Sequence, residues 1–426
     1  MLELMIFVCY HSLMKKYDLS QKMYIVEATA EHLISIVVSG AFLATLTKHL
    51  GISDSITGIL SSVSTLGCLF QLISLFFQPT RKKPFVIALS IANQLLFVSL
   101  YFIPLLNINS TVKIALFVAI IILAYLIYNI AHAKKIAWLM SLVDDSHRGS
   151  FTADKEMTSL WVGMVFSFAM GALSDKFIEK GQHTFAFISF AAVMLVLCIV
   201  HTVSMLKASE SPSSSQSKPN IISALMSVLS NKKMRGVMLT FVLYQIATHT
   251  STPFYSTYLI NDLGFSLKTV TAMSIVGSVS RIVVSRFWGR FADKHSFAKM
   301  FGRASGLLAL AYVAVVFTGP KTAPVLFLAY YILHGMALGG TNSGLINLVF
   351  DYAPNESRAD ALAVCQAVAG VVGFLSTLAL SPLVSIIQKS GNTVFGLPIY
   401  AQQLLSVAAV IISVILVLWV KKAFKK

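Results

Sequence analysis

Hydrophobic residues are grouped along this chain in long continuous blocks, and short polar segments separate the blocks. Each block has about 20 residues, the length that an α-helix needs to cross the hydrocarbon core of a bilayer. Strands of a membrane β-barrel would be about ten residues long with alternating polar positions, and the sequence lacks that pattern. The blocks therefore predict twelve transmembrane helices, at residues 24–46, 55–77, 85–106, 112–132, 157–176, 184–206, 236–260, 266–288, 299–318, 323–346, 361–387 and 399–420.

Composition and charge support a membrane protein. Hydrophobic residues make up 56% of the chain and charged residues 12%, which excludes an ordinary soluble domain. The net charge of +16 would by itself suggest a nucleic-acid partner. With a cytoplasmic amino terminus, however, 24 of the 33 Lys and Arg residues fall on the cytoplasmic side and seven outside. This bias predicts a multi-pass protein of the cell inner (cytoplasmic) membrane, with both termini cytoplasmic and the lipid bilayer, not nucleic acid, as its partner.

The chain contains an internal repeat, which predicts two related halves. "LGISDSITGILSS" begins at Leu50, after the first span, and "LGFSLKTVTAMSI" begins at Leu263, after the seventh. Asp154 and Asp360 correspond in a second, weaker repeat. We therefore divide the chain into a cytoplasmic segment (1–23), two six-helix bundles (24–206 and 236–420), a Ser-rich cytoplasmic linker (207–235) and a cytoplasmic tail (421–426). The segment from residue 221 to 233 fits either an amphipathic surface helix or a flexible tether.

Other sites are not indicated. The four cysteines have no paired spacing, the histidines have no metal-ligand spacing, and no nucleotide-binding loop is found. We expect a monomer that is not an enzyme and has neither a metal nor a cofactor. Translation from Met1 and from Met14 both fit the sequence of the first residues.

The segment "GRFADKHSFAK" (289–299), between the eighth and ninth spans, carries Gly289, Asp293 and Lys294. It resembles the loop signature of the major facilitator superfamily of transporters, in a bacterial form. The resemblance implies an all-α integral membrane fold of two pseudo-symmetric six-helix bundles around a central cavity lined by spans 1, 4, 7 and 10. It also implies a gating role for Asp293, whose carboxylate would bind the positive amino end of span 11 in one state. Arg148 resembles the family's basic residue before span 5, where it fits either an inside gate with the loop after span 2 or a solvated helix start. The candidate gating residues are thus Gly289, Asp293, Lys294 and Arg148, joined by Arg281 below.

The spans expected to line the cavity carry polar residues at helical spacing. On span 4 they occur at i, i+3, i+4 and i+7, and on span 7 Pro253 follows them and would interrupt the helix. Each such residue fits solute binding or a hydrogen bond between helices. The candidate solute-binding residues are Tyr125, Tyr128, Asn129 and His132 of span 4, Gln245, His249 and Thr252 of span 7, and Tyr331, His334 and Asn342 of span 10.

Charged residues within spans are the sharpest candidates, because burying a charge in lipid is costly. Glu27 and Glu31 form one stripe with Ser35 and Ser39, and His32 points about 100° away. Two carboxylates one turn apart in a weakly polar wall do not both ionise easily, so we expect Glu31, with Glu27 and His32, to exchange a proton. The alternative for Glu27 is a surface ion pair with Lys22.

Arg281 lies within span 8 at a similar depth. It fits a gating role in which it neutralises a glutamate in one conformation, and it also fits a packing role beside Arg286.

The sequence thus predicts a secondary active transporter that moves a small solute by alternating access, coupled to protons. The alternatives are multidrug-type efflux of amphipathic compounds, and a transport-fold sensor or assembly protein without flux. The sequence identifies neither the solute nor the direction of transport.

Overall fold

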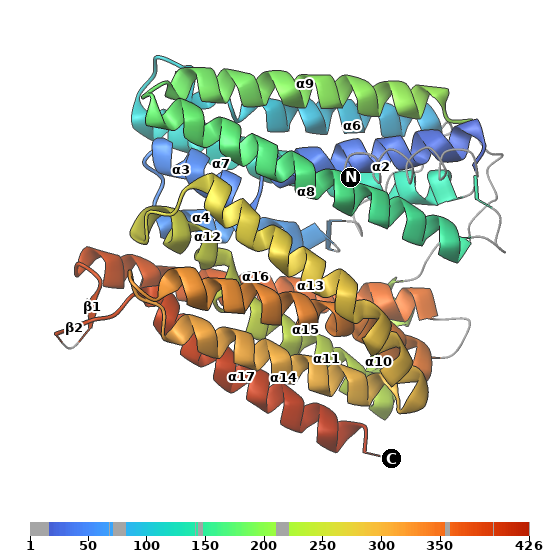
Figure 1. The fold of residues 1–426 in the computed structure, drawn as a ribbon. Helices are drawn as coiled ribbons and strands as arrows, with labels where there is room; N and C mark the ends of the chain where they lie inside the picture. The colour runs from blue at the N-terminus through green and yellow to red at the C-terminus, as the bar shows by residue number, and fades with distance from the viewer. Residues whose placement is uncertain are drawn as a thin grey trace. The chain divides into compact units, whose positions relative to one another are not determined.

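The structure is a computed structural model that describes residues 17–67, 69–70, 82–140, 142–143, 148–209, 221–353, 358–394 and 396–425 (Figure 1). Almost all of these residues are helical. Within them, the strands are limited to β1 (Thr393–Val394) and β2 (Leu397–Pro398), which pair antiparallel as a small hairpin. The predicted all-α class is confirmed.

Eight helices in the described part of the chain are long and apolar enough to cross a membrane, and a bent pair near the amino terminus would make nine. The remaining predicted spans contain shorter or interrupted helices. The predicted span 55–77 begins with α4 (Asp54–Ser62) and the 3-10 helix η1 (Val63–Leu66), and residues 71–77 lie outside the described part. The multi-pass membrane character therefore agrees with the sequence prediction.

Contacts divide the chain into two compact units. The first comprises Met1–Leu50 and Phe70–Gln216, and the second comprises Gly51–Leu69 and Ser217–Lys426. The segment with α4 thus belongs to the second unit, although the repeat would assign it to the first half. Its contacts explain this, because Thr65 donates a hydrogen bond to the Gly370 carbonyl at 3.3 Å, and Ser55 and Ser381 are hydrogen-bonded.

In the first unit, α2 packs against both α8 and α9, while α6 packs against α7 and α9 (Figure 1). Tyr24, Trp138 and Phe151 belong to its buried apolar core. The helices of this unit are α2 (Leu19–Val37), α3 (Gly40–His49), α6 (Lys82–Ser99), the short 3-10 helix η3 (Ile103–Leu105), α7 (Ser110–Met140), α8 (Arg148–Glu179) and α9 (His183–Lys207).

In the second unit, α14 packs against α15 and α17, α13 against α15, and α16 against α11 and α4. Helix α10 forms where the sequence allowed a helix or a tether, and it packs against α16 and α11. The further helices of this unit are α10 (Ile221–Ser230), α11 (Lys232–His249), the 3-10 helix η5 (Thr252–Phe254), α12 (Tyr255–Thr257), the π-helix η6 (Tyr258–Asp262), α13 (Leu267–Lys294), α14 (Phe297–Val316), α15 (Ala323–Tyr352), α16 (Arg358–Lys389) and α17 (Ala401–Ala423).

Two predicted spans are interrupted at identifiable residues. The helix axis bends by 42° between α2 and α3, where Gly40 has a φ of 54° that favours glycine. In the seventh span α11 ends at His249, and Pro253 lies at the start of the 3-10 turn that follows. Proline lacks the N–H that an α-helix needs at this point. The predicted break at Pro253 is confirmed.

Candidate functional site

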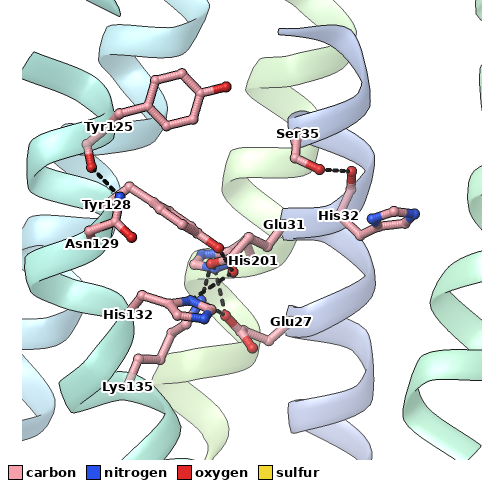
Figure 2. Close-up of polar contacts among 10 residues, drawn as sticks. All are labelled: Glu27, Glu31, His32, Ser35, Tyr125, Tyr128, Asn129, His132, Lys135 and His201. Carbon is pink, nitrogen blue, oxygen red and sulfur yellow. Dashed lines mark hydrogen bonds and ion pairs between the residues drawn. The ribbon is translucent and has the colours of Figure 1, made fainter. Parts of the chain in front are cut away.

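Five ionisable side chains of the first unit lie together between α2, α7 and α9 (Figure 2). We call them the acid–lysine–histidine cluster: Glu27 and Glu31 from α2, His132 and Lys135 from α7, and His201 from α9. The Lys135 ammonium donates to Glu27 Oε1 at 2.6 Å and also to Glu31 Oε2. His201 Nε2 lies 2.8 Å from Glu27 Oε1 and 3.5 Å from Glu31 Oε2. One ammonium therefore bridges two carboxylates one helical turn apart.

The cluster is buried at one end and accessible at the other. The side chains of Glu27 and His201 are 1% and 0% exposed, and that of Lys135 is 4% exposed. Glu31 is 19% exposed and His132 is 24% exposed. The cluster is therefore open to its surroundings at Glu31 and His132, whereas Glu27 depends on its protein partners for solvation.

Glu31 has two further neighbours on α7. The Tyr128 hydroxyl donates to Glu31 Oε1 at 3.2 Å, and His132 Nδ1 lies 3.4 Å from the same oxygen. The rings of Tyr128 and His132 are 4.9 Å apart, which holds both side chains on the same face of α7. Positions 128, 132 and 135 are spaced i, i+4 and i+7, so all three side chains point toward α2.

The predicted polar stripe starts on α2, changes environment along its length and does not lie on one helix, because α2 ends at Val37 and Ser39 is the residue that precedes α3 after the 42° bend. Glu27 is buried and Glu31 half-buried, while Ser35 and Ser39 are exposed. The Ser35 hydroxyl donates to the His32 carbonyl at 2.7 Å, and Ser39 donates to the Ser35 carbonyl at 2.7 Å. The carboxylates at the buried end form the cluster, and the two hydroxyls continue the stripe at the exposed end.

His32 does not join the cluster. Its ring points away from Glu31, as Figure 2 shows, and lies against Gly163 of α8, where a Cβ would stand 2.8 Å from His32 Nε2. The one-residue offset from Glu31 turns the side chain by about 100°. Its place in proton coupling remains a sequence prediction.

Two of the four span-4 candidates also lie away from the cluster. Asn129 is buried and donates to the Tyr125 carbonyl at 2.8 Å. The Tyr125 ring packs edge-on against Phe97, with centroids 5.3 Å apart. Asn129 therefore bonds within its own helix, and Tyr125 contacts α6 through its ring instead of through the hydrogen bond between helices that the sequence allowed.

Lys135 and His201 are the two cluster residues that the sequence reasoning missed. The predicted end of span 4 at residue 132 is wrong, because α7 continues to Met140 and buries Lys135. The i+3 spacing from His132 was a signal for Lys135. His201 is a single histidine in an apolar span, and its partners come from other helices, so no local pattern marks it.

Glu27, Glu31 and His201 offer ligand atoms that lie within 4.8 Å of one another, a separation at which they could hold a metal ion. The Lys135 ammonium contacts both carboxylates, so a metal ion would first have to displace it. Glu27 is thus paired with the buried Lys135 and not with Lys22, the surface partner that the sequence allowed.

The span-7 candidates lie in the second unit. Gln245 and His249 lie against Gly373 of α16, where a Cβ would meet both side chains at 3.2–3.3 Å. The Thr377 hydroxyl of α16 donates to the His249 carbonyl at 2.9 Å. Thr252 donates back to the Thr248 carbonyl at the helix break, at 2.7 Å. Gln245 and His249 thus pack α11 against α16, and Thr252 makes a backbone contact at the helix break.

Of the span-10 candidates, Tyr331 lies where α15 packs against α13. The helices touch where a Cβ on Gly335 would stand 2.1 Å from the Gly277 carbonyl oxygen. A Cβ on Gly277 would likewise stand 2.8 Å from the Tyr331 carbonyl oxygen. His334 stacks on Tyr330 with centroids 5.1 Å apart. Asn342 lies further along α15 and is exposed.

The candidate gating residues are helical. The predicted loop from residue 289 is wrong, because Gly289, Asp293 and Lys294 form the last turns of α13. Helix α14 follows after the two residues His295 and Ser296, since the Ser296 hydroxyl accepts from the Lys299 N–H and caps α14. Asp293 is exposed. Arg148 begins α8, but its side chain lies outside the described part.

Residues 29–377 match the sequence family described as the Major Facilitator Superfamily, which is most of the chain. The chain belongs to this superfamily. The predicted membership is confirmed, and with it the predicted all-α membrane fold. The chain is therefore a multi-pass membrane protein and a secondary transporter of a small solute.

Solved structures of superfamily transporters share the fold. A variant of the nucleoside transporter NupG is 15% identical, with a TM-score of 0.69 over 96% of this chain and 100% of its own. The POT family transporter PepTSo is 11% identical, with a TM-score of 0.69 over 96% and 98%. A D-xylose–proton symporter is 12% identical, with a TM-score of 0.67 over 93% and 96%. A search of curated proteins finds no significant match.

Proposed function

We propose that this superfamily transporter couples solute movement to protons, with the acid–lysine–histidine cluster as its coupling site. The supporting observation is the buried bridge of Lys135 between Glu27 and Glu31. An unsatisfied charge within a membrane protein is expensive, and ionisable residues inside spans commonly serve ion or proton pathways.

The charge balance of the cluster supports exchange of one proton. Two carboxylates against one ammonium leave one negative charge when both histidines are neutral. Binding of one proton makes the cluster neutral, and neutrality is favoured where the surroundings are weakly polar. The cluster thus has two states that differ by one charge, as a coupling site requires.

Glu31 is the proposed proton carrier. It is half-buried, and its oxygens have partners on α7 in Tyr128, His132 and Lys135. Protonation of Glu31 would weaken its bond to Lys135 and leave the ammonium with Glu27, its more buried partner. We propose that this change of partner weakens the contact between α2 and α7 and thereby links proton binding to alternating access.

The proposed solute is a small compound that forms hydrogen bonds. The polar side chains of α11 and α15 favour such a solute over an amphipathic drug, and the likeness in fold to carriers of nucleosides and xylose gives a precedent. A cytoplasmic membrane location with both termini cytoplasmic, a monomeric state and the proton as coupling ion are parts of the same proposal.

The test uses the full chain reconstituted in liposomes, with labelled uridine, D-xylose and dialanine as probes. An imposed pH gradient should drive accumulation of at least one probe, and a protonophore should abolish it. The Glu31→Gln variant should lose gradient-driven accumulation and keep exchange of the same probe, while Glu179→Gln, which changes an exposed carboxylate at the end of α8, should keep both.

If the wild-type protein transports a probe at a rate that does not depend on the pH gradient, proton coupling is contradicted. Gradient-driven flux that survives Glu31→Gln would contradict the proposed site. Absence of flux for every probe, with bound probe still detectable, would favour the sensor alternative.

A further inference from the structure

Arg281 lies at the middle of α13, a span of the second unit. Leu267 begins this helix and Lys294 ends it, so about 20 Å of helix separates Arg281 from either end. A guanidinium stays charged at any physiological pH. The position therefore places a permanent positive charge within an apolar helix that is long enough to cross a membrane, where it needs water or an anionic partner.

The side chain of Arg281 is on the inner face of α13. Val276, Val279, Val283 and Phe287 are exposed large apolar residues of this helix, and Val283, at 70%, is the most exposed of them. Positions 281 and 283 differ by about 200° around the helix axis. Gly277, one turn before Arg281, is instead in close contact with α15. Arg281 thus lies on the side of α15, half-buried, and away from the exposed apolar residues of α13.

The close approach of α13 and α15 brings Arg281 near other donors. A Cβ on Gly339 of α15 would stand 3.3 Å from the Arg281 carbonyl oxygen, and His334 and Thr341 lie on the same helix, within five residues of Gly339. The Tyr244 hydroxyl and the Thr341 hydroxyl are 3.3 Å apart, so a hydroxyl pair lies in the same region. Guanidinium, imidazole and hydroxyl groups together form a set rich in hydrogen-bond donors.

No acidic partner for Arg281 is found among the described residues of the second unit. All of their carboxylates are at helix ends: Asp54 begins α4, Asp262 ends η6, Asp293 and Asp351 are the second-last residues of α13 and α15, and Asp360 is the third residue of α16. Asp293, on the same helix, is about 18 Å along the axis from Arg281. The unit therefore has a central cation whose anion it does not supply.

We propose that Arg281, with His334 and Tyr244, binds an oxyanion of the solute, a carboxylate or a phosphate. This inference rests on the proposed function, since it names the solute class of the same carrier. A planar guanidinium matches both groups through two parallel hydrogen bonds, and the surrounding donors suit the remaining oxygens. An anionic solute also supplies the missing negative charge at the centre of α13.

The experiment measures thermal unfolding of the full chain in detergent, without any gradient. The probes are inorganic phosphate and acetate, each compared with chloride at matched ionic strength. A ligand that binds only the folded state raises the melting temperature in a saturable way. We expect at least one of the two probes to do so, and we expect the effect to disappear in Arg281→Gln.

Arg286→Gln is the matched control, because Arg286 lies on the same helix and is exposed. It should retain the saturable stabilisation. Arg281→Lys keeps the charge but loses the paired donors, so the apparent Kd should rise at least tenfold while the protein stays folded. The shift in melting temperature is then compared between galacturonate and galactose, and between ribose 5-phosphate and ribose. A larger shift for the charged member of the first pair indicates a carboxylate, and in the second pair a phosphate.

Stabilisation that persists in Arg281→Gln, or its absence for both probes in the wild-type protein, would overturn the proposal. The Glu31→Gln variant separates this outcome from failure of the proposed function. It should keep the anion effect, because binding requires no proton gradient. In the wild-type protein, flux that does not respond to the pH gradient, together with an intact anion effect, would count against the proton-coupling proposal alone. Gradient-driven flux without an anion effect would count against Arg281 alone.

Discussion

Replacement of Lys135 by glutamine should destabilise the protein by about 3 kcal/mol at neutral pH. Removing one partner of a buried ion pair costs about 3–5 kcal/mol, because the other charge remains buried without compensation. Lys135 and Glu27 are almost completely buried, which places the cost within this range. Glu31 is 19% exposed and recovers some hydration, so the lower end is expected.

The loss should depend on pH with a defined sign. In Lys135→Gln, protons can replace the ammonium as the neutralising charge, so the folded variant binds more protons than its unfolded chain. Stability therefore falls as the pH rises, and the destabilisation relative to the wild-type protein shrinks as the pH falls. The double variant Glu27→Gln/Lys135→Gln should recover part of the loss, since it leaves one buried charge fewer.

The assay is unfolding of the full chain in mixed micelles by titration with dodecyl sulfate, followed by helical circular dichroism at an acidic and a neutral pH. Lys176→Gln, at an exposed position of α8, should change stability by less than about 0.5 kcal/mol. A loss below about 1 kcal/mol for Lys135→Gln, or an equal loss at both pH values, would refute the reasoning on the buried bridge.

Three further variants test contacts within the two units, each by the same unfolding assay. Gly335→Ala should cost about 1–3 kcal/mol, because its Cβ would meet the Gly277 carbonyl, whereas Gly289→Ala has open space and should cost nothing; equal effects would contradict the close approach. Asp54→Ala should cost about 1–3 kcal/mol, because the Asp54 carboxylate accepts from Asn261 at 2.5 Å and Gln388 at 2.6 Å; a neutral result, like the one expected for exposed Asp293→Ala, would count against this bond. Tyr128→Phe should cost about 0.5–1.5 kcal/mol through its lost bond to Glu31, and Tyr125→Phe should cost less; the reverse order would be inconsistent with the cluster.

The fold class followed from the sequence because span length and charge bias depend on the bilayer, not on tertiary contacts. The break at Pro253 followed from the missing N–H of proline. The assignment of residues 51–69 to the second unit could not be predicted from the sequence. It depends on contacts such as that of Thr65 with Gly370, more than 300 positions away.

The sequence predicted part of the cluster, namely its residues on α2 and His132 on α7. Glu27 and Glu31 were found from their spacing and from the cost of charge in lipid, and Tyr128 and His132 from their common face. Lys135 was taken as a flanking basic residue because the hydrophobic block ends before it, although α7 continues as a helix. His201 could not be found, because its role depends on the packing of α9 against α2.

The central claim is that Glu31 gains and loses the coupling proton, and infrared difference spectroscopy of the full chain between acidic and alkaline pH tests it without a known solute. A protonated carboxyl has a carbonyl stretching band that the ionised form lacks. The proposal predicts such a band at acidic pH in the wild-type protein and in Glu179→Gln, and its loss in Glu31→Gln. A band that remains unchanged in Glu31→Gln, or no band in the wild-type protein, would contradict the assignment of Glu31 as the proton carrier.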